Sequence, residues 1–417
     1  MDHSIFIMII ASIGAFFMAF NNGANDVSNA FAPAVGSKAI SIKQALLIAA
    51  VLNLFGSVML GSNVALTMIN KILPPEVVQN GNYYIMGMIA CLVASGLFVL
   101  LSTLTSMPVS STHAIVGSLT GVVIAIEGWK TVNWKILGTI ALSWVISPVL
   151  AGILCWISIK IIRLFIFKPK NKQKILKRLH NWIPALIALT SIVTVYYWTL
   201  KSKSPFLQGW FTQIQLSILL SIAIFFTVRL LIGMWIKKSE ASAEGAEGIF
   251  KKLQVGTACY VAFAHGSNDV SNSISPVLAI LMVLEGVNFG GQIMTIPIWV
   301  LLIGGLGMSF GIMLLGHKVM ATLGHKITLI TNSKGFCIDF STATTVTLAS
   351  ILGMPVSTTH AATGSVVGVG LEKGLKGINL SLFIKIFAAW VITVPCAALI
   401  TIVLFYLFKG IGKFFSS

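Results

Sequence analysis

Charged side chains are scarce in this sequence. They make up 9% of its 417 residues, whereas soluble globular domains contain roughly 25%, and hydrophobic residues reach 56%. This composition excludes a soluble globule. Apolar runs long enough to cross ~30 Å of hydrocarbon recur along the chain, and they lack the alternation of polar and apolar residues found in membrane β-strands. We therefore predict an all-α polytopic membrane protein embedded in a lipid bilayer.

Paired cysteines and a cleavable leader are also lacking. The five cysteines (Cys91, Cys155, Cys259, Cys337 and Cys396) have no CxxC spacing, which argues against a disulfide framework or a zinc site. Residues 1–3 supply no basic region ahead of the first apolar run, so that run is expected to stay in the membrane. The formal net charge is +17, but Lys and Arg gather in connecting loops, so no nucleic-acid partner is expected.

The apolar runs predict about twelve transmembrane helices. They lie near residues 4–20, 42–62, 85–105, 113–127, 138–165, 183–200, 214–236, 253–264, 297–316, 337–353, 360–372 and 380–408. Several are shorter than the ~17 residues that a simple span needs. Placing both termini outside puts most Lys and Arg in or beside the inner loops, as the positive-inside rule requires.

Two loops differ from the rest and divide the chain. Residues 168–180 are strongly basic, and residues 237–252 are rich in Ser, Ala, Gly, Glu and Lys. We expect a first transmembrane repeat over 1–165, a linker region with two extra transmembrane helices over 166–252, and a second repeat over 253–417. The basic loop is expected to set the orientation of the chain, with binding to anionic lipid head groups as the alternative.

Three stretches of the sequence occur twice at nearly the same spacing. The pairs are 22–33 with 265–276, 107–121 with 354–368, and the Trp-Val-Ile runs at 144–146 and 390–392. Such a duplication indicates two structural repeats. An odd number of predicted crossings separates the copies, which predicts two inverted-topology repeats with interrupted or re-entrant helices near the membrane midplane.

The first repeated motif places one acid among several amides. Asn22, Asn25, Asp26 and Asn29 form one stripe on a helix, and His265, Asn268, Asp269 and Asn272 repeat it. Carboxylate and amide oxygens suit a hard cation, and glycines at 23 and 266 would let the backbone break or approach another helix closely. A hydrogen-bond network between helices is the alternative for one stripe, but an acid in both copies favours an ion site.

The second repeated motif joins a proline to a hydroxyl cluster. Pro108 precedes Ser110, Ser111 and Thr112, with Ala114, Gly117 and Gly121 after them; Pro355 precedes Ser357, Thr358 and Thr359, with Ala361, Gly364 and Gly368 after them. Because proline is favoured at the first helical position, we predict a helix that begins at each proline and offers its free N–H groups and hydroxyls to an anion. The small residues would let another helix pack closely. A proline-kinked helix whose hydroxyls bond to its own carbonyls is the alternative.

Three further titratable residues have open roles. His113 and His360 follow the hydroxyl clusters, where each could orient an anion, carry a proton or simply cap a buried polar cluster. Asp339 begins an apolar segment without a basic partner in sequence. An acid at the membrane interface is its simplest interpretation, with a place on an ion path as the alternative.

Charge balance links the two motifs. No Lys or Arg lies inside any of the four copies, so a site that holds both acids would be strongly anionic. Each helix N-terminus offers only about half a positive charge. An oxyanion could therefore bind there only together with more than one cation, which predicts co-transport.

These motifs closely resemble the signature of the PiT family of inorganic phosphate transporters. The resemblance rests on Gly23-Ala-Asn-Asp-Val-Ser-Asn29, Gly266-Ser-Asn-Asp-Val-Ser-Asn272, Pro108-Val-Ser-Ser-Thr-His113, Pro355-Val-Ser-Thr-Thr-His360 and Gly335-Phe-Cys-Ile-Asp339. It covers nearly the whole chain and is closest to the sodium-coupled branch. It implies a homodimeric symporter of the cell (inner or plasma) membrane that takes up phosphate with sodium, is not an enzyme and uses no cofactor.

The same resemblance assigns roles to individual residues. Sodium ligands are implied at Asn22, Asn25, Asp26, Asn268 and Asp269, and phosphate ligands at Ser110, Ser111, Thr112, Ser357, Thr358 and Thr359 with Asp26 and Asp269. Two residues depart from the pattern: His265 replaces the amide of Asn22, and Asn53 stands where sodium-coupled animal members carry a glutamate.

Other functions are weighed against this one. Proton-coupled transport of phosphate or of a metal-phosphate complex is the nearest alternative, with His113, His360 or Asp339 titrating. An intramembrane hydrolase is disfavoured because nucleophilic catalysis needs one asymmetric constellation, whereas these motifs are doubled. A passive channel is disfavoured because two fixed acids make a poor path for an anion.

Overall fold

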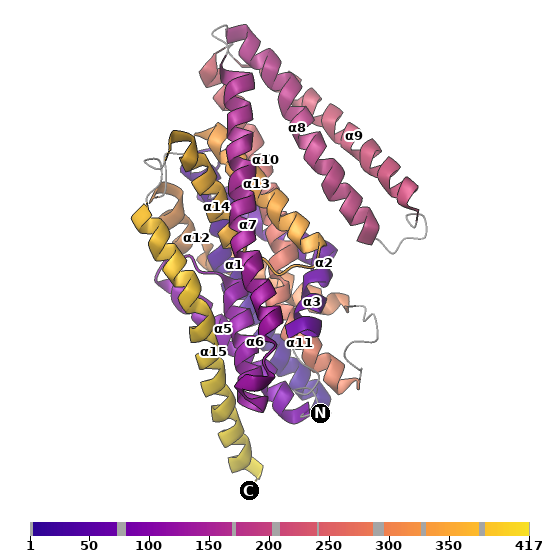
Figure 1. The fold of residues 1–417 in the computed structure, drawn as a ribbon, viewed down its shortest axis with the longest axis vertical. Coiled ribbons are helices and arrows are strands. Elements are labelled where there is room, and N and C mark those ends of the chain that lie inside the picture. The colour runs from indigo at the N-terminus through magenta and orange to yellow at the C-terminus, as the bar shows by residue number, and fades with distance from the viewer. Residues whose placement is uncertain are drawn as a thin grey trace.

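The computed structural model describes residues 3–72, 81–168, 172–201, 209–239, 242–286, 296–326, 331–374 and 380–416, and the regular structure within these ranges is helical (Figure 1). The helices are α1 (His3–Gly36), α2 (Ile42–Leu60), α3 (Ser62–Ile72), α5 (Gly81–Leu104), α6 (Ser111–Glu127), α7 (Trp134–Ile161), α8 (Lys172–Lys201), α9 (Trp210–Ile236), α10 (Ala243–Asp269), α11 (Ser271–Leu284), α12 (Ile298–Lys326), α13 (Asn332–Ile351), α14 (Thr358–Gly370) and α15 (Leu380–Ser416). Short helical turns η1 (Trp129–Thr131), η2 (Ile162–Phe167) and η4 (Leu371–Lys373) follow α6, α7 and α14. The predicted all-α class is confirmed.

Eight helical stretches in the described ranges are long and apolar enough to cross a membrane. They are His3–Gly36, Ile42–Leu60, Gly81–Leu104, Trp134–Phe167, Lys174–Tyr196, Trp210–Ile236, Ile298–Met320 and Ile384–Ile411, and the shorter α6 is also apolar. The predicted crossings at 253–264, 337–353 and 360–372 fall in α10, α13 and α14, which do not meet this criterion. α13 and α14 are buried among other helices and carry many polar residues, so twelve crossings stays a prediction.

Helices from the two sequence copies pack across each other. α6 lies along α15 and α14 along α7, whereas α1 lies along α12 and α10 along α2. In every pair, one helix comes from the first copy and the other from the second. The duplicated segments therefore form one interlocked body.

Glycines let the backbones of the paired helices approach each other closely. A Cβ atom added at Gly117 would overlap the backbone of Val394 on α15, and one at Gly364 would overlap the backbone of Pro148 on α7. A Cβ at Gly23 would likewise meet the backbone of Met308 on α12. Helix α1 runs unbroken through Gly23, so this glycine serves close packing and not a helix break.

The chain is interrupted between α5 and α6 and again between α13 and α14. Ser106 has a φ of 57° and Gly353 a φ of 68°. Beside them, the Met107 N–H donates to the Ser102 carbonyl at 2.9 Å, and the Met354 N–H donates to the Ala349 carbonyl at 2.8 Å. These bonds close both helix ends in the same way, as Schellman turns do.

The predicted helix starts at Pro108 and Pro355 are wrong. Ser110 and Ser357 are the N-caps, and their hydroxyl oxygens accept bonds from the N–H groups of His113 at 3.2 Å and His360 at 3.3 Å. The prolines lie two residues before the caps, in the connecting segments. The hydroxyl cap competes successfully with proline as a start signal because it satisfies an N–H group that would otherwise lack a partner.

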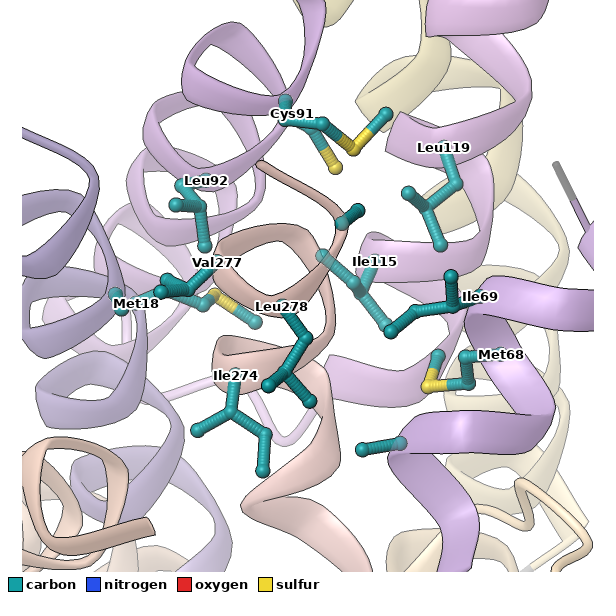
Figure 2. Close-up of a cluster of buried hydrophobic side chains, with 14 of the residues drawn as sticks. Met18, Met68, Ile69, Cys91, Leu92, Ile115, Leu119, Ile274, Val277 and Leu278 are labelled. Atoms are coloured by element: carbon teal, nitrogen blue, oxygen red, sulfur yellow. The ribbon is translucent and has the colours of Figure 1, made fainter. Parts of the chain in front are cut away.

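One cluster of buried apolar side chains packs α1, α3, α5, α6 and α11 together. Figure 2 shows side chains of this cluster filling the space between helices, among them Met18 of α1, Leu92 of α5, Ile115 of α6 and Leu278 of α11. In a bilayer such packing holds helices by van der Waals contact. It keeps the first turns of α6 and α11 beside α1.

Helices α8 and α9 pack against each other and stand at one end of the molecule (Figure 1). They reach the other helices through α10, α13 and η2. Both fall in the predicted linker region of 166–252. Their role as a unit separate from the two repeats stays a prediction.

The glycine contacts can be tested with two alanine substitutions. Gly364→Ala should lower the thermal unfolding midpoint of the detergent-solubilised protein, because the added methyl group overlaps the Pro148 backbone and overpacking costs about 1–3 kcal/mol. Gly138→Ala is the matched control. Nothing lies within 4 Å of a Cβ at that exposed position of α7, so it should leave the midpoint unchanged or raise it. Equal midpoints for both variants would contradict the close approach of α14 and α7.

Candidate functional site

Two carboxylates lie in the interior of the protein. Asp26 of α1 is 1% exposed, and Asp269 at the end of α10 is fully buried. Ser111 Oγ donates a hydrogen bond to Asp26 Oδ2 at 2.6 Å, and Thr358 Oγ1 donates one to Asp269 Oδ2 at 2.9 Å. Ser111 and Thr358 are the first residues of α6 and α14. Each acid of the first motif therefore meets a helix start of the second motif.

The starts of α6 and α14 are bonded to each other. Thr112 Oγ1 donates to the Val356 carbonyl at 3.2 Å, and Thr359 Oγ1 donates to the Val109 carbonyl at 3.2 Å. The six hydroxyl residues (Ser110, Ser111, Thr112, Ser357, Thr358 and Thr359) are all at most 3% exposed. First-turn N–H groups have no partner within their own helix, so two positive helix ends lie beside the two carboxylates.

The last amide of each stripe completes the cluster. Asn29 Nδ2 donates to Thr359 Oγ1 at 2.9 Å and lies 3.4 Å from Asp26 Oδ1. In the other copy, Asn272 Nδ2 donates to Ser111 Oγ at 3.2 Å. Both amides belong to the predicted polar stripes, but sequence reasoning assigned them no ligand role. Their position in the stripe was the signal that could have found them.

Asn25 and Asn268 hold the connecting segments in place. Asn25 Nδ2 donates to the Met107 carbonyl at 3.2 Å, and its Oδ1 accepts from the Val109 N–H at 3.3 Å. Asn268 Nδ2 donates to the Val356 carbonyl at 2.8 Å and to Asp269 Oδ1 at 2.5 Å. These two amides therefore position the segments that carry the hydroxyl clusters.

The two copies differ at Asn22 and His265. Asn22 Nδ2 donates to the Asp269 backbone carbonyl at 2.8 Å, and its buried Oδ1 has no hydrogen-bond partner among the described residues. His265 Nε2 lies 3.0 Å from Asp269 Oδ2 and 3.9 Å from Asp26 Oδ2. Its Nδ1 contacts Asn53 Oδ1. The two departures noted in the sequence, His265 and Asn53, thus meet in one contact.

The charge in this cluster comes from Asp26, Asp269 and, when protonated, His265. One ligand atom from each of the three lies within 4.8 Å of the others, as a bound cation would require. Among the described ion pairs, no Lys or Arg reaches either carboxylate. Asp26, Asp269 and His265 are each at most 1% exposed.

Three residues with open roles lie in unexpected surroundings. His113 Nδ1 bonds to the Trp390 carbonyl at 3.0 Å, and His360 Nδ1 bonds to the Trp144 carbonyl at 2.9 Å. The interpretation of Asp339 as an interfacial acid is wrong. Its side chain in α13 is fully buried, and its carboxylate oxygens have no hydrogen-bond partner in the described part of the chain. Sequence position alone placed it near a helix end, but the helices packed around α13 cover it.

Known proteins resemble this chain along nearly all of its length. The model of the phosphate transporter family matches residues 22–401. A protein of Thermococcus kodakarensis named "Putative phosphate permease" is 39% identical over 408 residues, which cover 97% of this chain and 98% of that protein. One of the same name from Haemophilus influenzae is 35% identical over 408 residues, which cover 96% of each. A solved structure described as "The sodium-dependent phosphate transporter" has a TM-score of 0.89 and 41% identity, covering 97% of this chain and 99% of that one.

The contact between His265 and Asp269 can be tested by a double-mutant cycle. His265→Asn and Asp269→Asn should each lower the thermal unfolding midpoint, and the double variant should lose less than the sum, because a contacting pair couples by about 0.5–3 kcal/mol. Asn22→Ala combined with Asp269→Asn is the control. Asn22 bonds to the backbone carbonyl of Asp269, which the substitution leaves in place, so these effects should add. Additive losses for His265 and Asp269 would show that the imidazole does not stabilise the carboxylate.

Proposed function

Because the chain belongs to the phosphate transporter family, we propose that it is a secondary active symporter that takes up inorganic phosphate together with sodium ions by alternating access. It is a multi-pass integral protein of the cell membrane and not an enzyme. One observation carries the proposal: Asp26 and Asp269 each accept a hydrogen bond from the hydroxyl at the start of a helix.

Phosphate would bind at the two helix starts. Helix N-termini present free N–H groups and a partial positive charge to an anion. The hydroxyls of Ser110, Ser111, Thr112, Ser357, Thr358 and Thr359 lie at the N-cap positions and in the first turns of these helices. Asp26 and Asp269 lie within hydrogen-bond distance of this cradle, where a protonated phosphate oxygen could donate to them.

Sodium would bind at the carboxylates. Asp26 and Asp269 with the free amide oxygen of Asn22 offer the oxygen ligands that hard cations prefer. Asn25 and Asn268 are proposed as further ligands, although their amide oxygens accept bonds from the Val109 N–H and the Ser350 hydroxyl in this conformation.

The hydroxyls could couple the two ligands. A hydroxyl has one proton to donate, and in this structure Ser111 and Thr358 donate theirs to the carboxylates. A cation on each carboxylate would neutralise it and release the hydroxyl to donate to phosphate. Sodium would thereby create the anion site, and phosphate would bind weakly without it because like charges repel.

The likeness to the solved sodium-dependent phosphate transporter supports sodium as the coupling ion. One observation favours a proton instead: His265 contacts both carboxylates and could carry a proton in place of a cation. Symport of protons with phosphate or a metal-phosphate complex is therefore the second candidate.

Finer features of the architecture belong to the same proposal. We propose two inverted-topology repeats, because the matching pairs of contacts, α6 with α15 and α14 with α7, are what a twofold relation between the copies would produce. A homodimer is proposed from the family resemblance.

Sodium coupling can be tested with purified protein in liposomes. An inward sodium gradient at fixed pH should raise uptake of labelled phosphate at least about tenfold over a potassium gradient, because phosphate needs cations at the two acids. Uptake that ignores sodium but follows a proton gradient would exclude sodium coupling and leave phosphate transport in place. Absence of phosphate uptake under either gradient would exclude the whole proposal.

The two acids can be tested one at a time. Asp26→Asn and Asp269→Asn should each reduce sodium-driven phosphate uptake at least about tenfold, because each removes a charge that holds a cation. Glu285→Gln is the control, since Glu285 is exposed at the end of α11 and should be dispensable. Equal amounts of each variant must be present in the membrane. Normal uptake by either Asp variant would remove that residue from the site.

A further inference from the structure

A small pocket lies beside the candidate site. Its volume is about 40 Å³, enough to hold a water molecule, and Asn29 and Thr359 of the site are among the residues that line it. Ala32, one turn beyond Asn29 on α1, continues the lining, as do Ala362 and Val366, one and two turns beyond Thr359 on α14. The pocket therefore follows α1 and α14 away from the hydroxyl clusters.

The duplication places a second set of residues in the matching position. The paired segments 107–121 and 354–368 match Ala362 to Ile115 and Val366 to Leu119. Ile115 and Leu119 are at most 1% exposed, and both belong to the apolar cluster that packs α1, α3, α5, α6 and α11 together. The counterpart of the pocket is therefore filled with apolar side chains.

Helix α3 supplies part of this filling. Its residues Met68 and Ile69 are 0% and 1% exposed and belong to the same cluster, and Figure 2 shows Ile69 pointing toward Ile115 of α6. Ser275 of α11 is the counterpart of Ala32, and its Oγ lies 3.7 Å from Met68 Sδ. Helix α3 thus covers the space between α6 and α11 that corresponds to the pocket.

Helices α2 and α12 occupy matching positions in the two copies. A Cβ atom at Gly56 of α2 would overlap the backbone of Phe263, and one at Gly311 of α12 would overlap the backbone of Phe20. Phe20 and Phe263 each lie two residues before a copy of the first repeated motif. Gly56 therefore corresponds to Gly311.

The chain continues differently beyond these matching glycines. Gly61, five residues after Gly56, ends α2, and α3 then begins as a separate helix. Gly316, five residues after Gly311, lies inside α12, which runs unbroken to its end. The same stretch is thus bent in one copy and straight in the other. In a transporter built from two related halves, such a difference marks a segment that can move about a hinge.

The pocket and α3 lie on opposite sides of the site. Helices α3, α6 and α11 lie in the half of the molecule that holds both chain ends, and α14 lies in the other half (Figure 1). The distribution of Lys and Arg predicts that both chain ends are outside the cell. In that topology α3 is on the outer side of the site and the pocket is on the inner side.

We propose that α3 is the lid of the outer route to the site, held shut by Met68 and Ile69, and that the pocket along α14 begins the inner route. The proposal rests on the symport proposed above. Phosphate and its cations would enter when α3 turns about Gly61 toward the straight path that α12 takes. While α3 is shut, its apolar side chains exclude ions, because an unpaired charge is costly to bury.

The lid can be tested by labelling Ser275→Cys, which places a thiol under α3. The full-length variant is treated with a membrane-impermeant methanethiosulfonate in right-side-out membrane vesicles, and mass spectrometry measures the labelling of this thiol. Met68→Ala together with Ile69→Ala should raise it at least about tenfold, because the shut lid loses packing. Leu92→Ala is the matched control. Leu92 belongs to the same cluster but packs beside Gly14 of α1, so labelling should stay unchanged.

Ala32→Cys is the counterpart on the inner route. Its thiol should react in inside-out vesicles and not in right-side-out ones, because Ala32 lines the pocket along α14. The two alanine substitutions in α3 should not raise this labelling. A rise at Ala32→Cys as large as that at Ser275→Cys would show a general loosening of the helices and would contradict a lid on one side.

A cross-link tests whether α3 must move during transport. Met68→Cys and Ser275→Cys in one chain, joined by a short bis-methanethiosulfonate, should hold α3 against α11. Uptake of labelled phosphate should fall at least about tenfold and recover when the disulfides are reduced, because a fixed lid stops the cycle. Each single variant treated with the same reagent is the control. It should lose less uptake, because its α3 stays free.

Two further results would overturn the proposal. Unchanged labelling of Ser275→Cys after the α3 substitutions would show that α3 does not cover this residue. Full uptake by the cross-linked variant would show that transport does not need α3 to move. The labelling does not depend on transport. A parent protein that takes up no phosphate would therefore refute the proposed symport, while the labelling would still decide whether α3 is a lid.

Discussion

The hydroxyl donors that Asp26 and Asp269 meet inside the protein constrain where its helices begin. Each buried acid costs at least ~2.5–3.5 kcal/mol on insertion scales. Asp26 and Asp269 meet no Lys or Arg among the described ion pairs, and receive hydroxyl bonds from Ser111 and Thr358 instead. Those hydroxyls are the first residues of α6 and α14, so two helices must begin in the interior. The interruptions after α5 and α13 follow from this need.

Neither sequence copy forms the site alone, because hydrogen bonds at the site join residues of both copies. The start of α6 bonds to the segment before α14 through Thr112 and Val356, and the reverse contact joins Thr359 to Val109. Asn29 of the first copy reaches Thr359 of the second. Because these bonds cross between copies, a movement of one helix start must change the surroundings of both acids. Cations at the carboxylates and an anion at the hydroxyls would then favour the same conformation.

The sequence predicted the helical class, both polar stripes and both hydroxyl clusters, because each is a local pattern that the duplication makes visible twice. It failed where the outcome depends on contacts between distant segments. The N-cap bonds of Ser110 and Ser357 moved the helix starts past the prolines, and packing around α13 buried Asp339. The contact of His265 with Asn53 joins two residues that no local pattern relates. Likewise, the matching Trp144 and Trp390 marked a repeat without indicating that each stacks on a histidine.

His265 stands in the second copy where the first copy has Asn22, so the surroundings of Asp26 and Asp269 differ. Asp269 has an imidazole nitrogen 3.0 Å from its carboxylate, whereas the same nitrogen lies 3.9 Å from Asp26. A protonated His265 would therefore reduce the cation affinity of Asp269 more than that of Asp26, since Coulomb repulsion falls with distance. Asn22, in the matching position, is neutral and bonds to the Asp269 backbone. With cations at both carboxylates, as proposed, the first copy would hold the stronger site while His265 is protonated, and the charge of the second site would depend on that proton.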